Sequence, residues 1–154
     1  MNKKVYLSKE GIEKLEYELR GLTTIRRLKI AEKIRIAKEQ GDLSENAEYS
    51  TAKDEQAFNE RRIVEITDML KNAELIDLIP AKKGTVGLGS RIIVASGGES
   101  YEYVIVGSSE ANPELGKISN ESPIGKAFIG KKVGEKIDVT VPAGTIAYTI
   151  TSVV

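Results

Sequence analysis

The sequence has 154 residues, 23 basic and 23 acidic side chains, and neither Cys nor His. The missing residue types exclude zinc fingers, Ser-His-Asp triads and imidazole bases, and the lack of Cys fits a reducing compartment. A charged fraction of 30% with 5% aromatic residues and a long heptad-like segment is typical of a helical hairpin joined to a small second domain. Residues 1–7 lack the apolar run of a signal peptide, and no run of about 18 apolar residues follows, so we expect a cytoplasmic protein without a membrane span.

The first half of the chain carries two segments with helical periodicity. Ser8 is suited to cap the first helix, and the apolar residues after it recur at spacings of three and four, loosening around Arg26 and Arg27. The two apolar seams comprise Ile12, Leu15, Leu19, Leu22, Ile30, Ile34 and Ala37, and then Tyr49, Ala52, Gln56, Asn59, Ile63, Ile66, Leu70 and Ala73. The polar residues Gln56 and Asn59 are expected to fix the register at a local cost in packing.

Two arms of similar length with a short break between them predict an antiparallel coiled-coil hairpin. The arms span residues 8–40 and 45–74, and at 1.5 Å per residue each is about 45 Å long. Gly41 is suited to the left-handed conformation that ends the first helix, and Asp42 or Ser44 is expected to cap the second.

The bend of this hairpin carries the residues Gly41-Asp-Leu-Ser-Glu-Asn-Ala-Glu-Tyr49. One interpretation is ordinary chemistry for ending one helix and starting the next, which accounts for an acid near a helix N-terminus. That interpretation does not require Asp42, Glu45 and Glu48 together. The other is that the end of the hairpin delivers carboxylates to another molecule.

Charge is sorted along the hairpin. Residues 26–38 hold six bases and one acid, whereas residues 39–60 hold seven acids and one base. Two interpretations stay open: the arms pair their charges for solubility, or a basic flank follows a phosphate backbone while an acidic end meets a cation.

Beyond residue 77 the helical period gives way to short strands and turns, with a boundary marked by Pro80 and Gly84. The expected elements are strands 91–95 and 101–106 around Gly97-Gly98, a helix at 124–129 after Ser122-Pro123, and strands 137–141 and 145–151 around residues 142–144. The chain is therefore predicted to be α+β, with a small antiparallel sheet covered by one short helix. Its glycines match no phosphate-binding pattern.

Over nearly its whole length the sequence resembles the bacterial Gre-type transcript cleavage factors of the GreA class. The bend motif at residues 41–49 is the most specific part of the match. A second motif is Ser122-Pro-Ile-Gly-Lys-Ala-Phe-Ile-Gly130, followed by Lys131-Lys-Val-Gly-Glu135.

The resemblance implies a coiled-coil hairpin at 1–77, with its tip at 41–46, and an FKBP-like β-rich domain at 78–154. Such factors bind RNA polymerase at the rim of the secondary channel, on the largest subunit, and insert the hairpin toward the active site. They are accessory factors rather than enzymes, because they stimulate the polymerase's own cleavage of backtracked nascent RNA and so rescue arrested complexes. We expect a monomer, since an entering hairpin must be free.

Asp42 and Glu45 correspond to the tip acids of the family, which implies that they act as catalytic residues and Mg²⁺ ligands only within the polymerase active site. No cofactor is expected on the chain alone. Mg²⁺ accepts one or two carboxylates while keeping waters and phosphate oxygens, so two acids suffice to complete a half-built two-metal site. Lys38 and Lys53 stand at the basic positions that flank the tip, where Arg is common; they keep the charge but lack the bidentate fork.

Two further groups of residues have alternative interpretations. Asn46 and Tyr49 are candidates to contact the RNA 3′ end, although Tyr49 also falls on the coiled-coil seam. Ser122, Pro123 and Ile124 either begin a helix or, as the resemblance implies, contact the polymerase rim.

Other functions stay open. A factor with the same fold can block the channel and inhibit RNA polymerase without cleavage, which the Asp42 and Glu45 pair argues against. A coiled-coil adaptor or a prolyl isomerase is the third class, and an isomerase needs an apolar pocket lined by aromatic residues. The aromatic residues beyond residue 80 are interpreted as core and strand-face residues instead: Tyr101, Tyr103, Phe128 and Tyr148.

Overall fold

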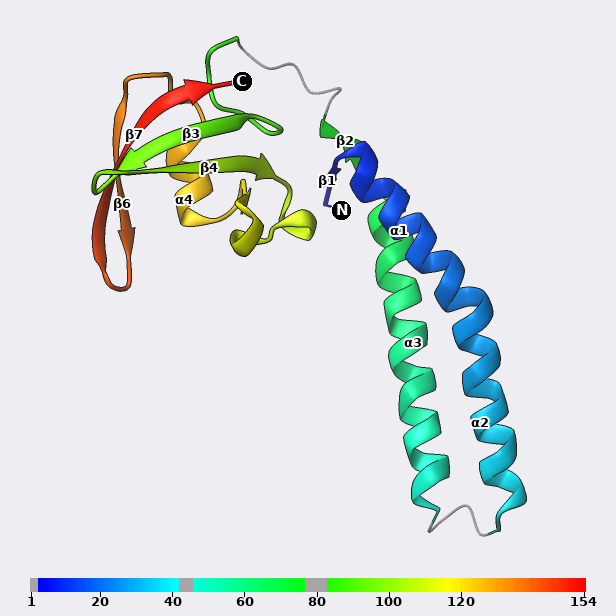
Figure 1. Ribbon diagram of the computed structural model, residues 1–154. Helices are drawn as coiled ribbons and strands as arrows, with labels where there is room; N and C mark the ends of the chain where they lie inside the picture. The colour runs from blue at the N-terminus through cyan, green and yellow to red at the C-terminus, as the bar shows by residue number, and fades with distance from the viewer. Residues whose placement is uncertain (1–2, 42–45, 77–82) are drawn as a thin grey trace. The chain divides into compact units, whose positions relative to one another are not determined.

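The computed structural model describes residues 3–41, 46–76 and 83–154 (Figure 1). The chain divides into two compact units, one made of Met1–Gly11 with Ala73–Val154 and the other of Ile12–Asn72. The α+β class predicted from the sequence is confirmed. The expected domain boundary at 77/78 lies in the segment 77–82, outside the described residues, and stays a prediction, whereas the first 11 residues group with the β-rich unit rather than with the hairpin.

The helical unit is a hairpin of two long arms (Figure 1). The first arm is continuous through α1 (Lys9–Gly21), a π-helical turn η1 (Leu22–Arg26) and α2 (Arg27–Glu39), and the second is α3 (Ala47–Lys71). Ser8 caps α1 as predicted, because its Oγ accepts a hydrogen bond from the Gly11 amide at 3.0 Å. The second arm is shorter than the expected 45–74, because residues 73–75 form a strand.

Part of the predicted seam is buried between the two arms. Its buried members are Ile30, Ile34, Ala37, Ala52, Asn59, Ile63 and Ile66. From Leu22 to Ile30 the first seam advances by eight residues instead of the seven of one heptad. The π-helical turn lies in this interval and accommodates the extra residue, so that both stretches of the first arm face α3.

Asn59 occupies the seam opposite the π-helical turn. Its side chain is 3% exposed, and its Nδ2 donates to the Leu22 carbonyl at 3.1 Å. A π-helical turn displaces the regular carbonyl-to-amide pattern, and a buried carbonyl left without a donor is costly. The polar residue on the seam thus satisfies a carbonyl of the opposite arm.

The other unit contains a five-stranded sheet in the order β5-β4-β3-β7-β6. The strands are β3 (Arg91–Ser96), β4 (Glu99–Val106), β5 (Lys117–Ser119), β6 (Lys136–Val141) and β7 (Gly144–Val153). Both predicted hairpins are present, and Gly97 and Gly98 join β3 to β4 with φ of +58° and +81°, the conformation of a type I′ turn.

The sheet is mixed rather than antiparallel, which corrects the prediction. Strand β5 pairs in parallel with β4. The chain between them passes through the short helices η3 (Ser108–Glu110) and η4 (Pro113–Leu115), so it crosses back and enters β5 in the direction of β4. A three-residue strand carries too little alternation to be predicted from sequence.

One helix, α4 (Pro123–Phe128), packs against the sheet and completes its core. The core consists of Val86, Ile92, Val94, Ile105, Ile118, Phe128, Ile137, Val139, Tyr148 and Ile150. Gly125 of α4 lies so close to β5 that a Cβ would stand 1.9 Å from the Ser119 carbonyl oxygen. The approach of α4 to this edge of the sheet therefore requires glycine.

A second, two-stranded sheet belongs to the same unit. It pairs β1 (Val5–Leu7) with β2 (Ala73–Leu75) in parallel, so the residues before α1 lie beside those after α3. Leu7 is 1% exposed. Hydrogen bonds from Ser8 to Glu110 of η3 tie these first residues to the β-rich unit.

Candidate functional site

The predicted site lies between the two arms, where α2 ends and α3 begins. Asp42 and Glu45 are outside the described residues, and their roles stay predictions. The residues that adjoin them are described: Gly41 has a φ of +126°, in line with its expected role as the stop of the first helix.

Asn46 is the residue that caps α3. Its Oδ1 accepts hydrogen bonds from the amides of Glu48 at 3.0 Å and Tyr49 at 3.2 Å, and its Nδ2 donates to the Ala37 carbonyl at 2.8 Å. The expectation that Asp42 or Ser44 caps this helix is therefore wrong. One amide side chain thus accepts hydrogen bonds at the start of the second arm and donates one near the end of the first arm.

The other predicted tip residues have distinct surroundings. Tyr49 is partly buried against Ile30, Ile34 and Ala52, which supports its position in the seam. Lys38 and Lys53 are exposed, and the Lys53 ammonium donates to Gln56 Oε1 at 2.7 Å. The predicted contacts of Asn46, Tyr49 and the two lysines with RNA remain predictions.

Much of the sorted charge pairs between the arms. Arg27 binds Glu60 at 2.8 Å and Lys33 binds Glu55 at 2.9 Å, while Arg26 lies 3.6 Å from Glu55. Hydrogen bonds from Lys33 and from Arg27 lower the pKa of the Glu55 and Glu60 carboxyls, respectively. This pattern supports charge pairing between the arms as one reason for the segregation.

Some of the sorted charges have no such partner. Within the described part of the chain, Lys29 and Lys38 form no ion pair with a carboxylate, and neither Glu48 nor Asp54 forms one with a base. Pairing between the arms therefore does not account for every charge near the tip. The second interpretation, that some charges serve another molecule, stays open for these.

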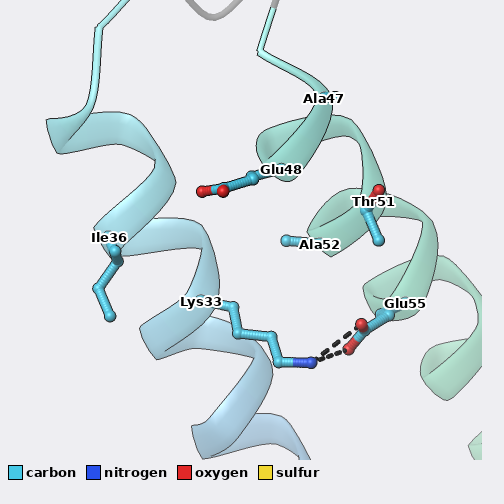
Figure 2. Close-up of a pocket in the computed structure, with 7 residues that line it drawn as sticks. All are labelled: Lys33, Ile36, Ala47, Glu48, Thr51, Ala52 and Glu55. Carbon is cyan, nitrogen blue, oxygen red and sulfur yellow. Dashed lines mark hydrogen bonds and ion pairs between the residues drawn. The ribbon is translucent and has the colours of Figure 1, made fainter.

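A groove that the sequence did not predict lies between the arms next to the tip (Figure 2). It has a volume of about 380 Å³ and is lined by Lys33 and Ile36 of α2 and by Ala47, Glu48, Thr51, Ala52 and Glu55 of α3. Ile36 is an apolar residue off the seam, and it is 42% exposed. An apolar residue outside the predicted seam is the sequence feature that could have indicated this groove.

The predicted docking segment begins a helix. Ser122 Oγ accepts from the Gly125 amide at 3.0 Å and donates to the Ser119 carbonyl at 2.7 Å, and Pro123 follows in the first turn. Ile124 packs against the core, and Pro123 is exposed. The helix-start interpretation is supported, and contact of these three residues with a polymerase stays a prediction.

The aromatic residues of the β-rich unit pack on one another. Ring centroids are 6.2 Å apart for Tyr101 and Tyr103, 6.3 Å for Tyr103 and Phe128, and 5.4 Å for Phe128 and Tyr148. Phe128 is fully buried, and burial raises the pKa of the Tyr103 hydroxyl. This arrangement supports the core interpretation over the aromatic pocket of an isomerase.

Within residues 3–41, 46–76 and 83–154, no group of three or more acidic side chains is arranged to hold a metal ion. No helix in these ranges has the length and apolar character needed to cross a membrane.

Comparison with known proteins identifies the family. The family model for the transcription elongation factor N-terminal domain matches residues 5–75, and the model for the GreA/GreB C-terminal domain matches residues 81–154. Transcription elongation factor GreA of Caldanaerobacter subterraneus subsp. tengcongensis is 54% identical over 148 residues, covering 95% of this chain and 94% of that protein. GreA of Clostridium botulinum strain Okra is 51% identical over 153 residues, covering 98% and 96%.

Among solved structures, the GreA factor homolog 1 (Gfh1) of Thermus thermophilus is 29% identical and covers 99% of both chains, with a TM-score of 0.43.

The two family models cover both halves of the sequence, and the relatives named above align over nearly their whole length. The resemblance seen in the two sequence motifs is therefore confirmed, and the chain belongs to the GreA/GreB family of transcription elongation factors.

Proposed function

We propose that this chain is a cytoplasmic accessory factor that binds RNA polymerase and stimulates the polymerase's own cleavage of backtracked nascent RNA. In this proposal the β-rich unit docks at the rim of the secondary channel and the hairpin enters the channel. Asp42 and Glu45 then complete the active site of the polymerase. Family membership and the intact pair of acids in the bend motif support this function over inhibition without cleavage.

The observation that carries the proposal is the capping of α3 by Asn46. A carboxylate at the start of a helix is ordinarily explained as a cap. Here the amide of Asn46 fills that role and also holds the end of α2 through Ala37. Capping of α3 therefore does not explain why the bend motif carries Asp42 and Glu45, and a role toward another molecule does.

The chemistry of the two acids fits the proposed site. Carboxylates are ligands that Mg²⁺ accepts alongside waters and phosphate oxygens, and the ion would supply an activated water and charge stabilisation at the leaving oxygen. One acid would bind the ion directly or through water, while the other would orient the attacking water. Lys38 and Lys53, both exposed, would attract the phosphates of the RNA 3′ end.

The test uses stalled, backtracked elongation complexes supplied with Mg²⁺, in which the release of short RNA fragments from the 3′ end is followed over time. The full-length chain is expected to accelerate release, and Asp42→Ala or Glu45→Ala is expected to lower the stimulated rate by roughly 100-fold. Asp68→Ala is the matched control, because Asp68 is an exposed acid of α3 far from the bend in the sequence. If the double variant Asp42→Ala with Glu45→Ala matches the wild type, or if the wild type slows synthesis without releasing fragments, the proposed function is wrong.

A further inference from the structure

The groove beside the tip, which we call the tip groove, has an unbalanced charge. Its lining contains one base, Lys33, whose ammonium donates to both carboxylate oxygens of Glu55 at 2.9 Å (Figure 2). Arg26 adds a second positive charge 3.6 Å from the same carboxylate. Glu55 therefore holds the Lys33 ammonium in place, although Arg26, which lies outside the lining, leaves this group of three with one net positive charge.

Glu48 supplies the unmatched charge of the tip groove. Its side chain lies on the first turn of α3 and extends toward α2 in Figure 2. Within the described part of the chain it forms no ion pair. The lining thus presents the Glu48 carboxylate beside a lysine whose ammonium is held by Glu55.

The rest of the lining is apolar except for Thr51. Ile36 lines the groove and is 42% exposed, and Ala47 and Ala52 carry no atoms beyond Cβ. A volume of about 380 Å³ lies at the lower end of the range for ligand pockets. It is adequate for one long side chain with an aliphatic stem.

We propose that the tip groove receives a Lys or Arg side chain of RNA polymerase when the hairpin is bound. This inference rests on the proposed function, because it assigns the partner from that function. The aliphatic stem lies on Ile36 and Ala52, and the cationic head pairs with the Glu48 carboxylate. Such complementary charges fix the register of two partners and discriminate against wrong ones.

RNA is the less suitable occupant. Its phosphates would approach the negative charge of Glu48, and Lys33, the one base of the lining, is held by Glu55. Lys38 and Lys53 lie outside the lining and remain the residues suited to phosphate. The groove and the flanking bases are therefore assigned to different partners.

The experiment measures equilibrium binding of fluorescently labelled full-length variants to core RNA polymerase without nucleic acid, and to backtracked elongation complexes. Glu48→Lys is expected to weaken binding about tenfold in both cases, and Glu48→Gln by a smaller factor. Ile36→Ser tests the apolar floor and is expected to weaken binding about threefold. Circular dichroism on each variant checks that the hairpin is intact.

Matched controls carry the same chemical changes elsewhere on the hairpin. Asp68→Lys reverses an exposed acid of α3 outside the groove, and Val64→Ser removes an apolar residue that is 58% exposed. Both are expected to bind like the wild type. A loss of affinity in the Glu48 and Ile36 variants but not in the controls supports the proposal.

Three results overturn it. Unchanged binding of the Glu48 variants, with wild-type cleavage intact, rejects the groove as a docking site and leaves the proposed function standing. A loss confined to complexes that contain backtracked RNA identifies RNA as the occupant instead. Failure of the wild type to bind polymerase at all rejects the proposed function and this inference together.

Discussion

Asn46 shows how a single side chain sets the geometry of the tip. Its amide oxygen takes two free amides at the start of α3, and its amide nitrogen satisfies the carbonyl of Ala37 near the end of α2. Helix ends leave such groups without partners inside the helix. Asn is the only residue type besides Gln that offers both a carbonyl oxygen and an NH₂ group on one side chain.

Replacing this residue should loosen the hairpin at the tip. Asn46→Ala removes the cap and the bond to Ala37, and we expect it to lower the free energy of unfolding by about 2 kcal/mol. Asn46→Asp keeps the acceptor but loses the donor, so its effect should be about half as large. Chemical denaturation followed by circular dichroism measures both, and equal stability of the two variants and the wild type would contradict the assignment.

At this scale the sequence pattern predicted Asp42 or Ser44 as the cap and missed Asn46. Asp42, Ser44 and Asn46 are all favoured cap residues. The choice depends on which of them can also reach the opposite arm, and that is decided by the packing of α2 on α3 rather than by local sequence. The same packing produced the tip groove, whose two sides lie more than ten residues apart in the chain.

At the scale of elements, the π-helical turn η1 keeps the apolar seam of the first arm facing the apolar seam of α3. The second arm keeps a regular heptad from Tyr49 to Ala73, while the first arm contains one extra residue between Leu22 and Ile30. The π-helical turn absorbs it without breaking the helix. The loosening that the sequence shows at Arg26 and Arg27 has this physical cause.

This account predicts that the extra residue is dispensable for folding. Deleting the exposed residue Thr24 restores a continuous heptad in the first arm, and we expect the melting temperature to change by no more than about 5 °C. Deleting Asp54 from α3 instead shifts its seam out of phase, and we expect a far larger loss. Circular dichroism melts compare the two deletions. A similar loss of melting temperature in both would contradict the claim that the π-helical turn accommodates one extra residue.

The ion pairs between the arms make the stability of the hairpin depend on pH. The carboxyls of Glu55 and Glu60 have pKa values lowered from an ordinary 4.5 by hydrogen bonds from Lys33 and Arg27. A carboxyl whose pKa is lower in the folded state contributes stability above its unfolded pKa, and this contribution is lost as the pH falls through the folded value. These pairs therefore stabilise the hairpin at neutral pH and cease to do so in acid.

We expect the melting temperature of the hairpin to stay level from about pH 7 to about pH 5 and to fall below that. The double variant Glu55→Gln with Glu60→Gln should show a smaller fall over the same range. Melts recorded at several pH values provide the comparison. An identical pH dependence in the wild type and the double variant would show that these two pairs do not contribute.

At the scale of the whole molecule, Glu110 joins segments that are 102 residues apart. Its carboxylate accepts from the Ser8 amide at 2.8 Å and from the Ser8 hydroxyl at 2.6 Å, at the start of α1. In a capping box, an acid three residues after the cap makes the bond to the amide of the capping residue. Here that position is Gly11, where a Cβ would lie 2.3 Å from Glu110 Oε1, so an acid from η3 takes the role.

We expect Glu110→Ala to lower the free energy of unfolding by about 2 kcal/mol, because two hydrogen bonds to a charged group are lost. Glu114→Ala is the matched control, since Glu114 is an exposed acid in the neighbouring η4. Gly11→Ala should destabilise the wild type but cost less in the Glu110→Ala background, where the carboxylate is absent. Denaturation curves of the four variants measure this coupling, and additive effects would contradict it.

The sequence by itself determined the helical hairpin, the two β-hairpins and the Ser122 cap of α4. Helical periodicity, paired glycines and cap residues act over a few residues, so they are readable without the fold. The bend motif also singled out Asp42 and Glu45 and the family that carries them.

Only the tertiary structure decided which residue caps α3, where the first arm turns π-helical, and how Glu110 reaches Ser8. It also decided the parallel pairings of β1 with β2 and of β4 with β5. Each of these depends on two segments that are distant in the chain and meet after packing. A local sequence pattern does not predict contacts between distant segments. The arrangement of the whole unit decides which partner satisfies a backbone group or fills a groove.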